Sequence, residues 1–393
     1  MRQLMIASGV GNAHLARLLL IARVLREQGH EVVFATGGDG GLAAGEEFET
    51  FELPEAAISD FNDNVYAAYT PALVDRCVRE ERAVIEAVRP DVVVADFRPT
   101  AAISARLAQV PYVSVVNAYL TSAFDPVDVL LAPATAGAKR AFASFAARRV
   151  QSSQKRKLAA GLHDVARRHG LARLTSLDDF YVGDVTLIAD LPEFCPLRSL
   201  PDAHRYVGPL IWEPARDDLL SELDPTRPLV YATTGNTGPS RLVDLVVDAF
   251  GEDGRYEVAL TTGPYVDLPT SPPRNVHAAR YARASALLSR AVAVVHGGGN
   301  GSTYQGLAAG VPAVVVPYTN DQRINAHLVA RRGVGLALAL DKLTARQLRA
   351  AVELVAADAE MRPRLLHFQE LMTSARGPEA AAREILTLGA PAR

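Results

Sequence analysis

Short runs of apolar residues recur along the chain and are separated by longer segments with helical periodicity. Each run is only a few residues long, is rich in Val and Ile, and does not alternate with polar residues. Such continuous runs are typical of strands buried on both faces of a parallel sheet. The predicted strands are residues 4–7, 31–35, 91–95, 113–116, 229–232, 258–260, 291–295 and 313–316.

The segments between these runs predict helices. After the first run, Leu15, Leu18, Ala22 and Leu25 form one apolar face at helical spacing, and Gly29 ends the segment. Strand and helix then alternate along the chain. This alternation predicts an α/β protein with parallel sheets.

The pattern is interrupted once, and we place a domain boundary there. Residues 208–228 contain four prolines and charges of both signs, as expected of a linker. We predict a first domain over residues 1–210, a linker over 211–228 and a second domain over 229–393, whose last helix is free to pack back on the first domain.

The two halves also resemble each other. VVVAD at 92–96 matches VAVVH at 292–296, and LAQVPYVSVV matches LAAGVPAVVVP further on. Two similar doubly wound, Rossmann-like domains explain this repeat.

Charge and cysteine content narrow the class of protein. The 393 residues include 41 Lys and Arg against 44 Asp and Glu, a net charge of −3 without a basic tail, which argues against a nucleic-acid partner. Cys77 and Cys195 lie far apart and suggest reduced thiols in a cytoplasmic protein. The start, MRQLMIASGVG, predicts a strand rather than a signal peptide, and no run is long enough for stable membrane insertion.

In open α/β sheets, ligands bind beyond the carboxyl ends of the strands. Three such ends carry reactive side chains: His14 follows the first strand, Asp96 ends the strand at 91–95, and His296 ends its counterpart in the second half. Chemistry is therefore expected at these positions.

A glycine-rich loop, GGGNGSTYQGLAAGVP, follows His296 and leads into a helix predicted to open near Ser302. Backbone N–H groups and the helix dipole favour a phosphate at such a place. A tight turn that needs glycine for its backbone conformation is the alternative interpretation. The loop at Thr233, Thr234 and Gly235 gives a weaker signal of the same kind.

At this point the sequence resembles a known family. The run HGGGNGSTYQGLAAGVPAVVVPYTNDQRINA is similar to the donor-site signature of GT-B glycosyltransferases. More narrowly, it resembles the family 1 inverting enzymes, including the bacterial transferases of antibiotic and other natural-product biosynthesis. The resemblance extends over nearly the whole chain through GHEV, VVVAD and YVGPL. It implies two Rossmann-like domains that face an interdomain crevice.

The resemblance implies a role for two residues of the first half. His14 lies fifteen residues before Gly29, where the family places its catalytic base, and Asp96 is implied to orient its imidazole. A histidine titrating near neutral pH suits proton removal, and a carboxylate fixes its tautomer. The alternative is that both residues only cap helices.

Other positions are implied to hold the nucleotide-sugar donor. Asp321 and Gln322 match the pair that family members direct at sugar hydroxyls, although Asp321 also fits an N-cap for a helix beginning near Gln322. Residues implied to bind the diphosphate are Thr233, Thr234, Gly235, His296, Gly298, Asn300, Gly301 and Ser302.

Three departures from the family pattern stand out. The loop has one extra residue between His296 and Gly310, which affects the register of His296 on the phosphate. In the base-binding segment, where relatives have an aromatic residue followed by V-P-Q, this chain has Tyr281, Ala282, Arg283 and Ala284. Arg17 stands where a proline is common, and we expect little consequence from it.

The first domain is implied to bind the acceptor through insertions at 54–89 and 118–173. Aromatic residues there favour an apolar or aromatic small molecule, although aromatics at such spacings also occur in cores. The expected acceptor-binding residues are Tyr66, Tyr69, Tyr119 and Phe124.

Together these features predict an inverting, metal-independent transferase that uses a UDP- or TDP-sugar, needs no cofactor and glycosylates a hydroxyl or a carbon of the acceptor. A nucleotide-sugar 2-epimerase of the same fold is one alternative, and a catalytically silent partner of another transferase is a second. Whether the chain forms a homodimer stays open.

Overall fold

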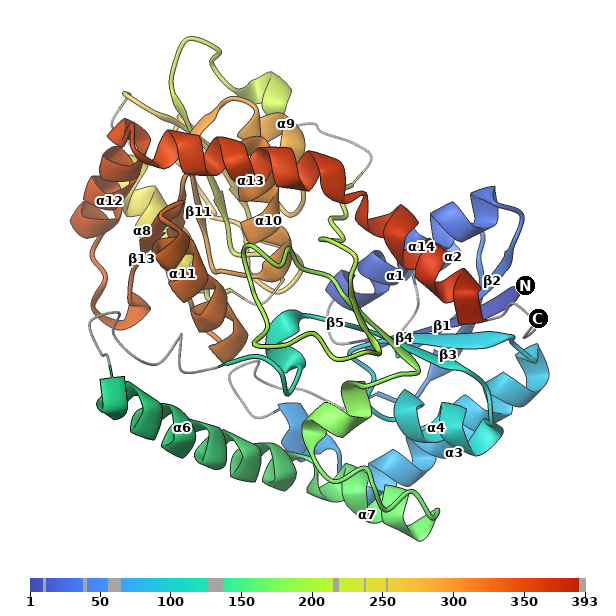
Figure 1. Cartoon of the computed structure of the whole chain (residues 1–393). Coiled ribbons are helices and arrows are strands. Elements are labelled where there is room, and N and C mark those ends of the chain that lie inside the picture. Colours follow the sequence, from blue (N-terminus) through green and yellow to red (C-terminus); the bar gives the residue numbers. More distant parts are fainter. Residues whose placement is uncertain are drawn as a thin grey trace. The chain divides into compact units, whose positions relative to one another are not determined.

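The chain divides into two α/β units, each built around one parallel sheet (Figure 1). The computed structural model describes residues 1–9, 12–37, 41–55, 65–125, 137–214, 219–236, 238–251 and 254–388. The first unit comprises Met1–Leu210 and Ala375–Arg393, and the second comprises Ile211–Ser374.

The first unit contains a seven-stranded sheet in the order β3-β2-β1-β4-β5-β6-β7. Its strands are β1 (Arg2–Ala7), β2 (Glu31–Gly37), β3 (Glu49–Leu53), β4 (Val92–Asp96), β5 (Tyr112–Val116), β6 (Val185–Ile188) and β7 (His204–Tyr206). Its α-helices are α1 (Asn12–Glu27), α2 (Gly41–Ala44), α3 (Pro71–Val88), α4 (Ala101–Ala108), α6 (Gly137–Leu158), α7 (Ala160–Arg168) and α14 (Gly377–Leu388). Short 3₁₀ turns are η1 (Val65–Ala68), η2 (Ala118–Leu120) and η3 (Leu177–Tyr181).

Helices cover both faces of this sheet. Helices α1 and α14 pack against each other on one face, and α3 and α4 pack together on the other (Figure 1). The C-terminal helix α14 thus belongs to the first unit, although it follows the second unit in the sequence.

The second unit contains a six-stranded sheet in the order β10-β9-β8-β11-β12-β13. Its strands are β8 (Leu229–Thr233), β9 (Glu257–Thr261), β10 (Val276–Ala279), β11 (Ala291–His296), β12 (Ala313–Val315) and β13 (Gly335–Ala337). Its helices are α8 (Ser240–Phe250), α9 (Ala284–Leu288), α10 (Asn300–Ala309), α11 (Asn320–Arg332), α12 (Ala345–Ala357) and α13 (Met361–Ala375), with 3₁₀ turns η4 (Leu220–Glu222) and η5 (Leu340–Lys342).

The predicted α/β class with two doubly wound sheets is confirmed, and each of the eight predicted runs overlaps a strand, although 91–95 begins one residue before β4 and 313–316 ends one residue after β12. In β1, Leu4, Met5 and Ile6 are all fully buried, which explains a continuous apolar run rather than an alternating one. Among the strands of the described ranges, β3, β6, β7, β10 and β13 were not predicted.

Both sheets reverse their strand order at one point, and the candidate residues lie there. In the first sheet the reversal is between β1 and β4, where Ala7 pairs with Asp96. In the second it is between β8 and β11, where Thr233 pairs with His296. Crevices at such switch points are the usual ligand sites of doubly wound folds.

Candidate functional site

His14 and Asp96 are brought together at the switch point of the first sheet. His14 lies in the first turn of α1, and its Nδ1 is 2.8 Å from Oδ1 of Asp96 at the end of β4. Asp96 is fully buried, whereas the His14 side chain keeps 21% of its surface exposed. With Nδ1–H donating to the carboxylate, Nε2 is the ring nitrogen that can accept a proton.

An aromatic ring also contacts the face of the His14 imidazole. Phe97 follows Asp96 in a left-handed conformation (φ 51°), and its ring stacks on His14 with centroids 4.6 Å apart and planes 8° from parallel. Bulky residues seldom adopt a positive φ. The conformation of Phe97 therefore depends on the contacts around the turn after β4. Tyr66 and Tyr181 flank Phe97, each with its ring centroid 6.0 Å away.

The four expected acceptor-binding aromatics fall into two groups. Tyr66 and Tyr119 are half-buried near the pair formed by His14 and Asp96, which we call the dyad. The Tyr119 hydroxyl lies 3.5 Å from Oδ1 of Asn117. Tyr69 and Phe124 are only 6% exposed and belong to the core. Burial raises the pKa of Tyr69 far above its usual range. Tyr69 and Phe124 therefore have little surface to offer an acceptor.

Arg17 forms a two-point ion pair with Asp96, which the sequence did not lead us to expect. Its Nε donates to Oδ2 at 2.7 Å and its Nη2 donates to Oδ1 at 2.6 Å. Burial by itself would raise the pKa of Asp96, but the charges of Arg17 and His14 outweigh it and hold that pKa below its usual range. The carboxylate therefore stays ionised.

A second buried ion cluster supports the loop after β1. Arg98 is 1% exposed and donates from Nε to Glu81 (2.7 Å) and from Nη1 to Glu55 (2.9 Å). Glu55 in turn accepts the backbone N–H of Gly9 at 2.6 Å. This chain of contacts fixes the end of β1, from which the chain leads to His14.

In the second unit, His296 ends β11 and is fully buried, with Gly297, Gly298 and Gly299 connecting it to α10. Its Nδ1 accepts the N–H of Gly298 at 2.9 Å, while Nε2 is buried without a hydrogen-bond partner among the described residues. Burial lowers the pKa of His296 to about 4, so the ring is neutral near pH 7.

The glycine-rich loop leads into α10 as predicted, but the helix begins at Asn300 with Gly299 as its N-cap, two residues before Ser302. Gly298 has φ 91°, and a Cβ there would lie 2.8 Å from the Gln322 carbonyl oxygen and 2.9 Å from Val315. Gly301 is exposed, and a Cβ there would meet nothing within 4 Å. Only the first of these two glycines is required by the fold itself.

Asn325 holds this loop; it lies within the signature run but is not among the residues that the resemblance implies for donor binding. It is 2% exposed, and its Nδ2 donates to the Gly298 carbonyl at 2.9 Å and lies 3.4 Å from Oδ1 of Asn300. A loop braced from α11 can present its remaining backbone N–H groups in a fixed arrangement.

The loop that begins at Thr233 is also held by local hydrogen bonds. Thr233 Oγ1 accepts the N–H of Gly235 at 3.0 Å, and Thr234 Oγ1 donates to the Thr262 carbonyl at 2.8 Å. Both threonines are buried. Gly235 adopts a left-handed conformation (φ 61°) at the turn.

The helix that carries Asp321 and Gln322 begins earlier than expected. α11 starts at Asn320 and its N-cap is Thr319, so Asp321 is not the N-cap. Gln322 Oε1 accepts the N–H groups of Tyr318 (2.8 Å) and Thr319 (3.2 Å) and thereby completes a capping box. Asp321 is exposed and accepts the Thr319 hydroxyl at 2.5 Å.

Tyr281 and Arg283 lie between β10 and α9. Tyr281 is 43% exposed, and Arg283 Nε is 3.9 Å from Oε2 of Glu213. Glu213 also accepts the N–H (2.7 Å) and the hydroxyl (2.7 Å) of Ser285. A carboxylate from residue 213 thus caps the start of α9.

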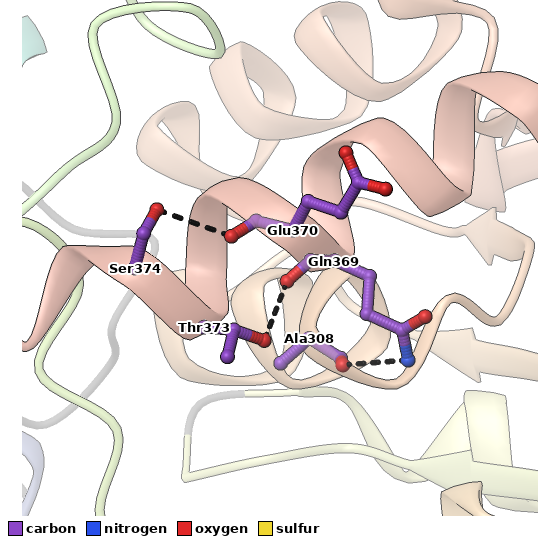
Figure 2. Close-up of a pocket in the computed structure, with 5 residues that line it drawn as sticks. All are labelled: Ala308, Gln369, Glu370, Thr373 and Ser374. Atoms are coloured by element: carbon purple, nitrogen blue, oxygen red, sulfur yellow. Dashed lines mark hydrogen bonds between the residues drawn. The ribbon is translucent and has the colours of Figure 1, made fainter.

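A depression of about 440 Å³ lies between α10 and α13, and Figure 2 shows its lining. The Gln369 amide donates to the Ala308 carbonyl (3.2 Å), and Thr373 and Ser374 donate to carbonyls of α13. The lining residues are Ala308, Gln369, Glu370, Thr373 and Ser374. This depression lies near the C-terminal end of α10, where the helix dipole disfavours an anion, and it does not belong to the candidate diphosphate site.

Within the described ranges, no helix is long and apolar enough to cross a membrane. In the same ranges, no group of three or more His, Cys, Asp or Glu side chains is placed to hold a metal ion.

The chain is similar to known proteins along most of its length. The family model described as "Erythromycin biosynthesis protein CIII-like, C-terminal domain" matches residues 253–388. A PGL/p-HBAD biosynthesis rhamnosyltransferase from Mycobacterium bovis (strain BCG / Pasteur 1173P2) is 32% identical over 376 residues, which are 92% of this chain and 82% of the relative. The chain belongs to this family of glycosyltransferases.

This glycosyltransferase is also similar to an inactive relative and to a solved structure. An inactive PGL/p-HBAD biosynthesis glycosyltransferase of the same organism is 30% identical over 264 residues, 64% of this chain and 71% of that protein. The solved structure of the glycosyltransferase of kitacinnamycin has a TM-score of 0.75 at 22% identity and covers 98% of both chains. This likeness confirms the predicted GT-B fold.

Proposed function

We propose that this glycosyltransferase is an inverting enzyme that moves a sugar from a nucleoside-diphosphate donor to a hydroxyl of a small apolar or aromatic acceptor. The observation that carries the proposal is the 2.8 Å contact between His14 Nδ1 and Asp96 Oδ1 at the switch point of the first sheet. It leaves Nε2 of a partly exposed imidazole as a base, which is the group that acceptor activation needs.

In the proposed step, His14 Nε2 takes the proton of the acceptor hydroxyl while the hydroxyl oxygen attacks C1 of the sugar. The bond between C1 and the diphosphate oxygen breaks, and the nucleoside diphosphate leaves with the electron pair. Attack on the side opposite the leaving group inverts the configuration at C1. Asp96 keeps the imidazole in one tautomer and stabilises the imidazolium as it forms.

The donor diphosphate is proposed to bind at the start of α10. The buried Nε2–H of His296 would donate to a phosphate oxygen, because its Nδ1 is already an acceptor for Gly298. The backbone N–H of Gly298 already donates to His296, so the N–H groups of residues 299–302 and the positive end of the α10 dipole would offset the charge of the leaving diphosphate, without a metal ion.

The remaining donor contacts are proposed from position. Asp321 is exposed at the start of α11, as a residue that binds sugar hydroxyls would be, whereas Gln322 is largely committed to its capping box. Tyr281 and Arg283 have the exposed surface that binding a nucleoside base requires.

The acceptor side is supported by the aromatic surroundings of His14. Phe97 stacks on the imidazole, and the half-buried Tyr66 and Tyr119 lie close to the same dyad. Such a surface favours an aromatic acceptor, because offset ring contacts add to the burial of apolar area.

The test uses the purified full chain with UDP- and dTDP-linked sugars and a panel of simple phenols and aliphatic alcohols. A nucleotide-linked rhamnose is the first donor to try, because the relative at 32% identity is a rhamnosyltransferase. We expect a glycoside in mass spectrometry whose anomeric configuration, read by proton NMR, is opposite to that of the donor. A product that keeps the donor configuration would overturn the inverting mechanism.

The same samples separate the two alternatives. An epimerase would convert the donor sugar into its 2-epimer without acceptor, and NMR of the donor pool detects this directly. A silent protein, as the name of the inactive relative suggests for that protein, would bind the donor without releasing nucleoside diphosphate. We expect nucleoside diphosphate release that depends on the acceptor.

A further inference from the structure

Arg17 lies three residues after His14 on α1, and both side chains meet the same carboxylate. Residues at this spacing share one face of a helix. Oδ1 of Asp96 is 2.8 Å from Nδ1 of His14 and accepts Nη2 of Arg17 at 2.6 Å, and Oδ2 accepts Nε at 2.7 Å. The carboxylate is therefore shared between the proposed base and a permanent positive charge.

The guanidinium is itself held in place. Arg17 is 8% exposed, and its Nη1 donates to Oδ1 of Asn117 at 2.9 Å. The amide of Asn117 donates to the two carboxylate oxygens of Asp190 at 3.2 and 3.3 Å. Asp190 also accepts the N–H of Ala118 at 2.6 Å. The planar fork can thus fix the plane of the Asp96 carboxylate and aim Oδ1 at the imidazole.

We propose that Arg17 is a positioning residue of the reaction: it orients the Asp96 carboxylate toward His14 and shares the charge of that carboxylate. This inference rests on the proposed function of the dyad. A carboxylate paired with a guanidinium stabilises an imidazolium less than an unpaired one does. Loss of the guanidinium should therefore strengthen the hold of Asp96 on the protonated imidazole.

The charged and phenolic groups near His14 and Asp96 in the described ranges come from α1 itself and from neighbouring elements. The proposed effect is exerted by Arg17 and Asp96 themselves, with Asp190 behind Asn117 and with Tyr119, Tyr66 and Tyr181 as the neighbouring phenols. On α14, which packs against α1, Glu379 pairs with Arg376, Glu384 pairs with Arg205, and Arg383 is exposed.

The test is a pH titration of His14 in the full chain labelled with ¹⁵N-histidine, whose signal is assigned by its loss in His14→Ala. Arg17→Met should raise the midpoint of the His14 titration by on the order of one pH unit, because it removes a positive charge near the imidazole and leaves Asp96 to stabilise the imidazolium alone. The acid limb of the pH–rate profile for transfer to a phenol should move in the same direction. An unchanged midpoint in a folded Arg17→Met variant would overturn the proposal.

Two further variants secure the result. Arg17→Lys keeps the charge but loses the fork, so it should give a smaller upward shift and a lower kcat. If Arg17→Met does not fold, Arg17→Lys decides, and wild-type values of both quantities would refute the proposal. Arg23→Met removes a similar ion pair with Glu46 from the same helix and should leave the His14 midpoint unchanged. Failure of the proposed function appears separately, as transfer that survives His14→Ala.

Discussion

The imidazole of His296 accepts a hydrogen bond from the backbone N–H of Gly298, with 2.9 Å between Nδ1 and N. The bond fixes the tautomer, because a neutral ring that accepts at Nδ1 carries its hydrogen on Nε2. A buried donor is thus aimed from the end of β11 before any ligand binds. The cost of holding it there without a partner is expected to be recovered when an anion arrives.

This arrangement predicts a pH dependence of stability. Burial lowers the pKa of His296 to about 4, whereas an unfolded histidine titrates near 6.5. Between these values the unfolded chain binds more protons, so the contribution of a neutral His296 is fully present above about pH 6.5 and is lost as the pH falls toward 4. Removing the imidazole should therefore reduce the acid sensitivity of the protein.

We expect His296→Asn, whose amide oxygen can still accept the Gly298 N–H, to lose on the order of 3 kcal/mol of the stability difference between neutral and acid pH. Urea unfolding at pH 7.5 and pH 4.5 measures this difference. His169→Asn, at an exposed position at the end of α7, is the matched control and should behave like the wild type. Equal acid sensitivity of wild type and His296→Asn would contradict the assignment of a buried neutral ring.

Gly301 separates a role in ligand binding from a role in folding. A Cβ at this position meets no atom within 4 Å, so Gly301→Val should fold normally. The added bulk would occupy the approach of a diphosphate to the first turn of α10, so binding of UDP and dTDP, measured by calorimetry, should be abolished. Ala308→Val, near the other end of the same helix, should bind as the wild type does. Unchanged affinity in Gly301→Val would place the phosphates elsewhere.

The buried carboxylate of Glu81 predicts a large effect on stability. It accepts Nε of Arg98 at 2.7 Å, the Thr100 hydroxyl at 2.5 Å and the Ser104 hydroxyl, and it is fully buried. Glu81→Gln leaves the buried guanidinium without one of its counter-charges and should cost about 3 to 5 kcal/mol in unfolding free energy. The adjacent and exposed Glu80→Gln should cost almost nothing, because its pair with Arg79 is at the surface. Chemical denaturation measures the unfolding free energy of both variants. A loss as small in Glu81→Gln as in Glu80→Gln would contradict the prediction.

The sequence predicted the parts of the fold that follow from strong local patterns. Buried central strands such as β1 and β11 are continuous apolar runs, and the residues that end them are visible at once. Two of the missed strands lack that signal: β3 reads ETFEL and β7 reads HRY, and both lie at sheet edges. Their extended form depends on a neighbouring strand rather than on their own composition.

Residues of the candidate site likewise differ in whether a local sequence pattern marks them. His14, Asp96 and His296 were predicted as site residues because strand ends and a motif mark them, whereas the buried cluster of Arg98 with Glu81 and Glu55 joins positions 17 and 43 residues apart that share no motif. The extent to which each side chain is buried could not be predicted from the sequence either. Tyr66 and Tyr69 look alike in the sequence, yet one is half-buried beside Phe97 and the other lies in the core.

The dyad itself gives the most direct prediction. His14→Ala removes the proposed base and should lower kcat by about 10² to 10⁴. Donor affinity should stay nearly intact, because the proposed donor contacts belong to the other unit. Asp96→Asn should act in the same direction but less strongly, since an amide can still contact the ring but no longer stabilises the imidazolium charge.

The double variant decides whether the two residues act together. It should be little worse than His14→Ala alone, because residues that work as one unit are not additive. The measurement is the rate of glycoside formation with whichever phenol the acceptor panel selects, and the exposed His169→Ala is the control that should keep the wild-type rate. Wild-type rates in both single variants, or loss of donor binding in His14→Ala, would mean that the pair only braces the start of α1 and that the proton is removed by another group.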